Sequence, residues 1–168
     1  ELRSQDIVLS VSDSGKVDSL TLDDYSASNR QNIENSGFYI VEYPGKQTHQ
    51  VQGDIKSSAN TISQHAVLEN ERLEFQAEYR TLPDYILVTG RIKDLSGKDR
   101  AVDVVYRLRV EAAGGLWWDD FQSRRPIEKA DKYQLRYYPL CCVSSPEKDY
   151  AASIAIPADK PCVHSFQY

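Results

Sequence analysis

Apolar and polar residues alternate along most of the chain, which is the pattern of strands that bury one face and expose the other to water. The clearest case is residues 73–80, where apolar side chains at every second position alternate with charged or amide side chains. Residues 7–11 and 17–22 have the same period on either side of a polar turn that contains glycine. We therefore expect a strand over residues 73–80 and a hairpin at the N-terminus.

The same pattern predicts further strands in the rest of the chain. They cover residues 37–43, short strands around Val51, Ile62 and Val67, and then residues 86–92, 102–110, 133–140, 151–156 and 163–168. A polar turn joins the strands at 86–92 and 102–110, so we expect these two to form the central hairpin. Residues 23–36 have no apolar stripe, which indicates an exposed loop of unusual length.

No segment has the period of a long amphipathic helix, and the one helix-permissive stretch, residues 128–134, is short and lacks capping residues. A chain with about ten to thirteen strands and no crossover helices is expected to form two antiparallel sheets packed face to face. We expect all of residues 1–168 to belong to this single β-sandwich domain.

Composition narrows the classes of partner. The formal net charge is -5 with a pI of about 5.2, and no basic stripe runs along any segment, which argues against a nucleic-acid partner. No apolar run reaches the roughly 18 residues that span a bilayer, so no membrane span is expected. Because the chain starts at Glu1 and contains no methionine, we expect a processed chain or a fragment of a longer one.

The three cysteines and three histidines do not form a recognisable catalytic or metal-binding motif. Cys141 and Cys142 point to opposite faces of a strand, so only one of them could pair with Cys162; the alternative is that all three are small buried hydrophobes. They lack the spacing of a zinc site, and no metal or cofactor is expected. The histidines lie in separate segments without a shared motif, at positions 49, 65 and 164.

The strongest candidate site is the segment Gly-Gly-Leu-Trp-Trp-Asp-Asp-Phe at residues 114–121, which holds both tryptophans of the chain. Adjacent side chains in a strand face opposite ways, so Trp117 and Trp118 divide between a core and a surface. An indole beside a carboxylate is typical of sugar-binding sites, whereas a structural corner of a β-fold explains the same residues. The candidate carbohydrate-binding residues are Trp117, Trp118, Asp119, Asp120, Arg124 and Arg125.

The charged members of this set have two interpretations. Arg124 and Arg125 could donate to sugar hydroxyls or uronate carboxylates, or they could pair with the neighbouring aspartates across a turn. Asp119 and Asp120 are disfavoured as the paired carboxylates of a glycosidase, because neighbouring strand residues diverge whereas glycosidase carboxyl groups face each other at about 5–9 Å. No catalytic residues are assigned.

Four segments in order resemble a known family: Val88–Tyr106 with its Gly-Lys-Asp-Arg turn, Leu116–Phe121 (LWWDDF), Tyr138–Val143 (YPLCCV) and Ala151–Pro157 (AASIAIP). They are similar to the β-supersandwich domain, of galactose-mutarotase-like fold, that precedes the catalytic barrel in some large bacterial glycoside hydrolases and related secreted proteins. The resemblance covers roughly residues 70–168.

This resemblance implies a non-catalytic accessory domain that binds carbohydrate, packs against a following catalytic domain of the same chain, or both. It also implies an extracytoplasmic setting, secreted or periplasmic. The alternatives are a free-standing carbohydrate-active enzyme of mutarotase or lyase type and a purely structural interaction module. Mutarotases use a histidine acid and a glutamate base, and neither maps by motif onto His49, His65 or His164.

Overall fold

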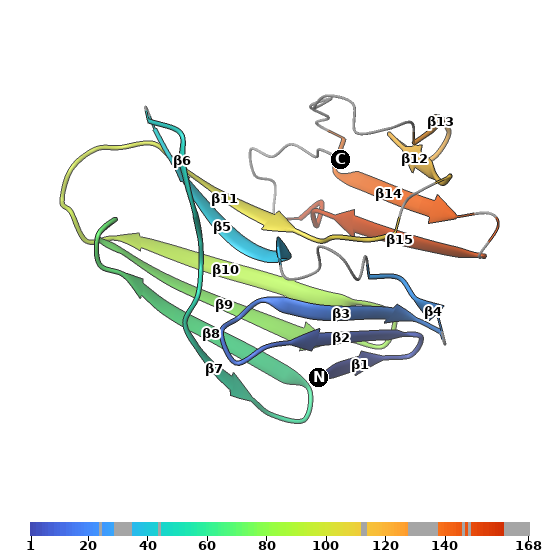
Figure 1. Cartoon of the computed structure of the whole chain (residues 1–168), viewed down its shortest axis with the longest axis horizontal. Helices are drawn as coiled ribbons and strands as arrows, with labels where there is room; N and C mark the ends of the chain where they lie inside the picture. The colour runs from blue at the N-terminus through green and yellow to red at the C-terminus, as the bar shows by residue number, and fades with distance from the viewer. Residues whose placement is uncertain are drawn as a thin grey trace. The chain divides into compact units, whose positions relative to one another are not determined.

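The structure is a computed structural model of the chain. It describes residues 1–23, 25–28, 35–43, 45–111, 114–127, 138–145, 147 and 149–159. Every named element among them is a β-strand, and every strand pair is antiparallel. The chain forms two compact units, residues 1–110 and residues 111–168, drawn from blue to yellow and from orange to red in Figure 1.

The first sheet of the first unit begins at the N-terminus. It contains β1 (Leu2–Ser4), β2 (Ile7–Val11), β3 (Val17–Leu22) and β4 (Tyr25–Ser26), in that order. The predicted N-terminal hairpin is confirmed, because β2 pairs with β3 across the turn that contains Gly15. Gly15 has φ +88°, a left-handed conformation that suits glycine.

The prediction of an exposed loop over residues 23–36 is wrong for residues 25–28 and Ser36, while Asp23 and Asn35 are exposed as expected. Tyr25 and Ser26 form β4, while Ala27, Ser28 and Ser36 are buried. The reason is backbone pairing: the amides of Ala27 and Ser28 both donate to the carbonyl of Leu20. These two hydrogen bonds hold the segment against β3, so it is buried although its sequence has no apolar stripe. Residues 24 and 29–34 lie outside the described residues.

The second sheet contains the longest strands and confirms the pattern at residues 73–80. Its order is β10 (Ile86–Asp94), β9 (Leu73–Thr81), β8 (Thr61–Leu68) and β7 (Asp54–Ser57), the green strands of Figure 1. Along β9 buried residues alternate with more exposed ones from Leu73 to Arg80. The sheet therefore has one apolar face and one polar face.

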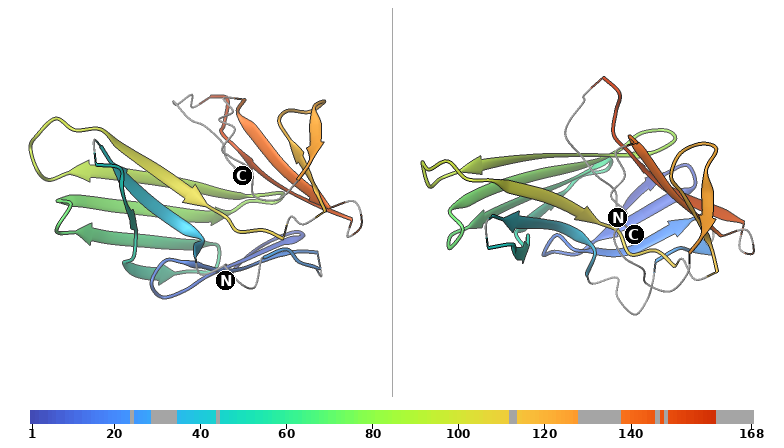
Figure 2. Two further views of the ribbon diagram at one scale, coloured as in Figure 1. Left: turned by 45° about the horizontal axis from the view of Figure 1, so that its top comes forward. Right: turned by 90° about the horizontal axis from the view of Figure 1, so that it is seen from above.

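The predicted central hairpin is wrong. The third sheet has the order β11 (Val102–Arg107), β5 (Gly37–Glu42) and β6 (Gln47–Gln50), so β11 pairs with β5 while β10 pairs with β9. Figure 2 shows β11 beside β5 from two directions. The residues between β10 and β11 carry the chain from one sheet to another instead of reversing it within a sheet. Alternation predicts strands but does not choose their partners.

A cluster of aromatic rings joins the second and third sheets. Phe38 of β5 lies 4.9 Å from both the Phe75 and the Tyr106 ring centroids and 5.9 Å from that of Tyr79. Phe75 and Tyr79 are fully buried. Burial raises the pKa of both the Tyr79 and the Tyr106 phenols. Rings at these separations form the tight aromatic packing that dominates a core.

The second unit is one sheet of short strands. Its order is β13 (Arg124–Pro126), β12 (Leu116–Trp118), β14 (Leu140–Ser145) and β15 (Tyr150–Ala155). The strand predicted at residues 151–156 is confirmed within one residue. The strand predicted at 133–140 falls mostly on residues 128–137, outside the described residues, as does the one predicted at 163–168.

The all-β, antiparallel class predicted from the sequence is confirmed. The described strands group into four sheets, three in the first unit and one in the second, and the more specific two-sheet supersandwich stays a prediction. The single-domain prediction likewise stays a prediction. Among the described residues there is no helix with the length and apolar character required to cross a bilayer.

Candidate functional site

The six residues predicted as a site lie on one hairpin, formed by β12, β13 and the turn between them. Trp117 is opposite Arg125, and Trp118 is opposite Arg124. The prediction that the two tryptophans face opposite ways is confirmed, because Trp117 is 2% exposed whereas Trp118 is partly exposed. The hairpin therefore divides the six residues into an inward group and an outward group.

The inward group is a cluster of polar contacts around a buried ring. The indole Nε1 of Trp117 donates to Asp119 Oδ1 at 2.8 Å, and the guanidinium of Arg125 donates to the same oxygen at 3.1 Å. Both charged side chains are about three quarters or more buried. This geometry matches the interpretation in which an arginine pairs with an aspartate across the turn, and it fixes the orientation of the indole.

Asp120 holds the turn itself. Its Oδ1 accepts the backbone N–H groups of Gln122 at 2.7 Å and Ser123 at 2.6 Å. These two bonds, that of Gln122 first, hold the pKa of the Asp120 carboxyl below its usual range. Asp119 and Asp120 therefore have separate hydrogen-bond partners.

The outward group consists of Trp118 and Arg124. The Trp118 indole donates to the hydroxyl of Ser144 on β14 at 2.8 Å, so its ring is held in place. The Arg124 guanidinium carbon lies 5.2 Å from the Trp118 ring centroid, within cation–π range. Arg124 is exposed and forms no ion pair with any described residue. An anchored indole and an exposed cation thus lie side by side.

Two further aromatic residues at this end of the sheet were not among the predicted site residues. Phe121, in the turn, is 74% exposed, and Tyr138, two residues before β14, is 40% exposed. Their ring centroids are 5.9 Å apart with an interplanar angle of 89°. The sequence did contain a sign of Phe121, since an apolar side chain between polar turn residues is expected to be exposed. We call Trp118, Phe121, Arg124 and Tyr138 the hairpin tip.

The cysteines of β14 are free thiols on opposite faces of the strand. Cys141 is buried, and burial raises its pKa to about 12; burial also raises the pKa of the half-buried Cys142. Cys162 lies outside the described residues. A thiol with a raised pKa is a weak nucleophile at neutral pH. No group of three or more histidine, cysteine, aspartate or glutamate side chains among the described residues could hold a metal ion.

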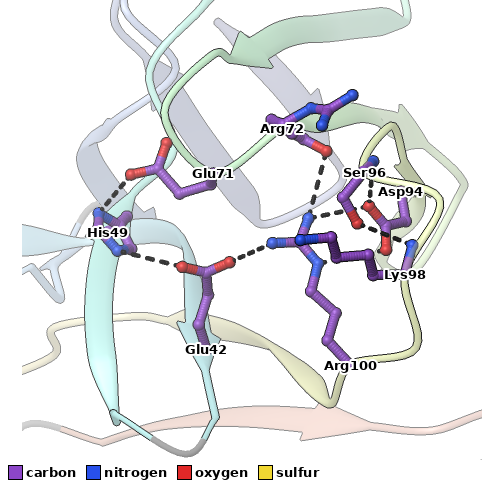
Figure 3. A network of polar contacts seen from close by, with 8 residues as sticks. All are labelled: Glu42, His49, Glu71, Arg72, Asp94, Ser96, Lys98 and Arg100. Atoms are coloured by element: carbon purple, nitrogen blue, oxygen red, sulfur yellow. Dashed lines mark hydrogen bonds and ion pairs between the residues drawn. The ribbon is translucent and has the colours of Figure 1, made fainter.

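His49 belongs to a polar network between the second and third sheets (Figure 3). Its Nδ1 lies 2.9 Å from Glu71 Oε1, and its Nε2 lies 3.9 Å from Glu42 Oε2. The other carboxylate oxygen of Glu42 accepts from Arg100 at 2.6 Å. The network places two carboxylates beside the imidazole, although His49 Nε2 is buried and has no hydrogen-bond partner among the described residues. These contacts join strands of two sheets, which is the arrangement of a structural clamp.

Arg100 is the centre of this clamp. It binds Asp94 through Nε at 3.2 Å and a terminal nitrogen at 3.0 Å, and it also donates to the backbone carbonyl of Arg72. The backbone N–H of Ser96 is the first cause that lowers the pKa of Asp94, and Arg100 contributes further. The guanidinium fork thereby connects β5, β10 and the turn before β9.

Replacing Arg100 with alanine is expected to lower the free energy of unfolding of the first unit by about 1–3 kcal/mol, since partly buried carboxylates lose a charged donor. Arg100→Lys is expected to recover only part of the loss, because an ammonium group cannot form the fork. Urea unfolding followed by circular dichroism measures both. Lys98→Ala, which removes an exposed cation of the same turn, is the control; equal losses for Lys98→Ala and Arg100→Ala would contradict the clamp.

His65 has a different setting. Its Nε2 lies 3.2 Å from Glu74 Oε1 on the polar face of the second sheet, and the amide of Gln76 donates to the same oxygen at 3.1 Å. The contact with His65 is the first cause that lowers the pKa of Glu74. His65 also lines an open hollow on this face. His164, the third histidine, lies outside the described residues.

The chain matches no protein-family model, no curated protein and no solved structure.

Proposed function

We propose that this chain is a non-catalytic accessory domain of a glycoside hydrolase-like protein and that it binds carbohydrate at the hairpin tip. The proposal includes the galactose-mutarotase-like supersandwich fold and an extracytoplasmic setting. The order of the four segments from Val88 to Pro157 supports the family, as does the antiparallel all-β architecture.

The observation that carries the proposal is the exposure of the aromatic pair Phe121 and Tyr138. Two exposed rings in contact form an apolar patch, and covering this patch with a ligand removes apolar surface from water, which is favourable. A pyranose ring has an apolar face of C–H groups that fits such a patch, while its hydroxyls remain available for hydrogen bonds. A carbohydrate is therefore a chemically matched ligand.

Trp118 and Arg124 add the polar half of the site. The bond from Trp118 to Ser144 orients the indole before any ligand arrives, which lowers the entropy cost of binding. Arg124 has donors that no carboxylate among the described residues occupies, and these can bind sugar hydroxyls or a uronate carboxylate. The buried contacts of Trp117, Asp119 and Arg125 supply the rigid base beneath them.

Binding can be tested on an array of neutral and acidic glycans with the wild-type chain and two variants. Phe121→Ala removes a highly exposed ring with little effect on folding, and Trp118→Ala removes the anchored indole. Each is expected to weaken binding at the tip at least about fivefold, from loss of an aromatic contact. Tyr85→Ala, which removes an exposed aromatic of the first unit, is the control.

Two results would contradict carbohydrate binding at the tip. The first is that Phe121→Ala and Trp118→Ala bind the same glycans with the same affinity as the wild type. The second is a wild-type chain that binds no glycan; the exposed rings would then fit the other role of the proposal, packing against a following catalytic domain.

The contact between His65 and Glu74 beside a hollow favours one second candidate, a free-standing carbohydrate-active enzyme of mutarotase or lyase type. A histidine next to a carboxylate can exchange a proton with a sugar hydroxyl. Polarimetry with freshly dissolved glucose and galactose tests this candidate. Mutarotation that the chain accelerates and His65→Ala abolishes would replace the accessory role by an enzymatic one.

A further inference from the structure

The outward side of the second sheet carries an open hollow of about 480 Å³. This volume falls within the roughly 300–1,000 Å³ of typical ligand pockets. The side chains around it come from all four strands of the sheet. Those used below, which we call the polar face, are Asp54, Lys56, Ser63, His65, Gln76, Glu78, Thr89 and Arg91.

Strand register arranges the polar face in two rows that cross the sheet. In one row Asp54 is opposite His65, which is opposite Gln76, which is opposite Arg91. In the other row the order is Lys56, Ser63, Glu78 and Thr89. Residues directly opposite each other in antiparallel strands share a face, so each row presents its side chains to the same side.

Within each row the oppositely charged residues are separated by one or two intervening strands, whereas Glu78 and Arg91 of different rows are diagonal neighbours on adjacent strands. Neighbouring strands are separated by about 4.8 Å. The Cα atoms of Asp54 and Arg91 are therefore about 14 Å apart across three spacings, and those of Lys56 and Glu78 are about 10 Å apart across two. None of these four side chains forms an ion pair with a described residue. A ligand that lies across the strands could contact both ends of a row.

The chemistry of the rows selects an uncharged ligand rich in hydroxyl groups. Carboxylates only accept hydrogen bonds, and ammonium and guanidinium groups only donate, whereas a hydroxyl group does both. The residues that line the hollows on this side of the sheet include three carboxylates and three cations: Asp54, Glu74, Glu78, Lys56, Arg91 and Lys93. Arg80 is a fourth cation on the same side, because it is two positions from Glu78 along β9. Like charges would repel a polyanion from the carboxylates and a polycation from the cations.

We propose that the polar face is a second binding site of the chain, and that its ligand is a neutral oligosaccharide that lies across β7–β10. The described lining residues include no phenylalanine, tyrosine or tryptophan, so hydrogen bonds supply the specificity. The proposal does not depend on the hairpin tip, since it rests on different residues in the other compact unit.

The test measures binding of short oligosaccharides of glucose, mannose, galactose and xylose by titration calorimetry, with oligogalacturonate as an anionic probe. At least one neutral probe is expected to bind the wild type and to bind about tenfold more weakly to Arg91→Ala and to Glu78→Gln, because each variant loses a charged hydrogen-bonding group. Phe121→Ala should leave the affinity of that probe unchanged. Arg80→Ala removes an exposed cation of β9 outside the hollow and is the matched control.

The outcomes separate the two sites. Neutral probes that bind Arg91→Ala and Glu78→Gln as tightly as the wild type, or a wild type that binds no neutral probe, overturn the proposal. Tighter binding of oligogalacturonate than of every neutral probe also overturns it. If affinity falls only in Phe121→Ala, the hairpin tip is the carbohydrate site and the polar face is not; if it falls only in Arg91→Ala and Glu78→Gln, the reverse holds.

Discussion

Replacing Trp117 with alanine is expected to lower the free energy of unfolding of the second unit by about 3–5 kcal/mol, the usual cost of deleting a buried aromatic side chain. Trp117 is 2% exposed and lies opposite Val143 in the middle strands of a sheet with only four short strands. The substitution also removes the indole donor from Asp119. A loss of this size is a large share of the roughly 5–15 kcal/mol that stabilises a typical domain.

Urea unfolding followed by tryptophan fluorescence measures this loss, because both tryptophans lie in the second unit and Trp118 remains as the reporter. Trp117→Phe keeps an aromatic ring but not the donor, so it is expected to recover most of the stability. Trp118→Tyr is the control at the adjacent, partly exposed position and should cost less than Trp117→Ala. If Trp117→Ala unfolds at the wild-type urea concentration, the buried cluster does not stabilise this sheet.

The strands were predictable because burial on one side of a sheet imposes a period of two, as in residues 73–80. Strand partners were not predictable in the same way. β10 and β11 follow each other through a polar turn, yet β11 pairs with β5, more than fifty positions earlier in the chain. The aromatic contacts of Phe38 with Phe75 and Tyr106 and the Arg100 clamp stabilise this arrangement, and such contacts between distant segments have no local pattern.

The candidate site was partly predictable for a similar reason. Parity along a strand placed Trp117 and Trp118 on opposite faces, as the structure confirms. The distribution of the aspartates was not predictable, since it depends on the turn: Asp119 is bound by Arg125, while Asp120 accepts two amides of its own turn. The rows of the polar face were not predictable either, because they depend on the register between strands, which alternation along one strand does not determine.

Replacing Gly53 with alanine is expected to lower the free energy of unfolding of the first unit by about 3 kcal/mol, at the upper end of the usual cost of overpacking. A Cβ at this position would overlap the backbone carbonyl of His65 and would lie 2.7 Å from the Cβ of Ala66. The obstacle is the backbone of β8, which cannot move away without disturbing its pairing with β7 and β9. The amide of Gly53 also donates to the carbonyl of Ser14, so the glycine is held from its other side.

Urea unfolding followed by far-ultraviolet circular dichroism measures the cost at Gly53. Gly45→Ala is the matched control, because its new Cβ would meet only the side chain of Gln47 at 3.7 Å and its φ is not positive. This control is expected to leave stability unchanged or to raise it slightly through a less flexible unfolded chain. Because β7 and β8 carry four residues of the polar face, Gly53→Ala should also weaken any oligosaccharide bound there. Equal stability of the two alanine variants would show that the close approach of Gly53 to β8 does not constrain the fold.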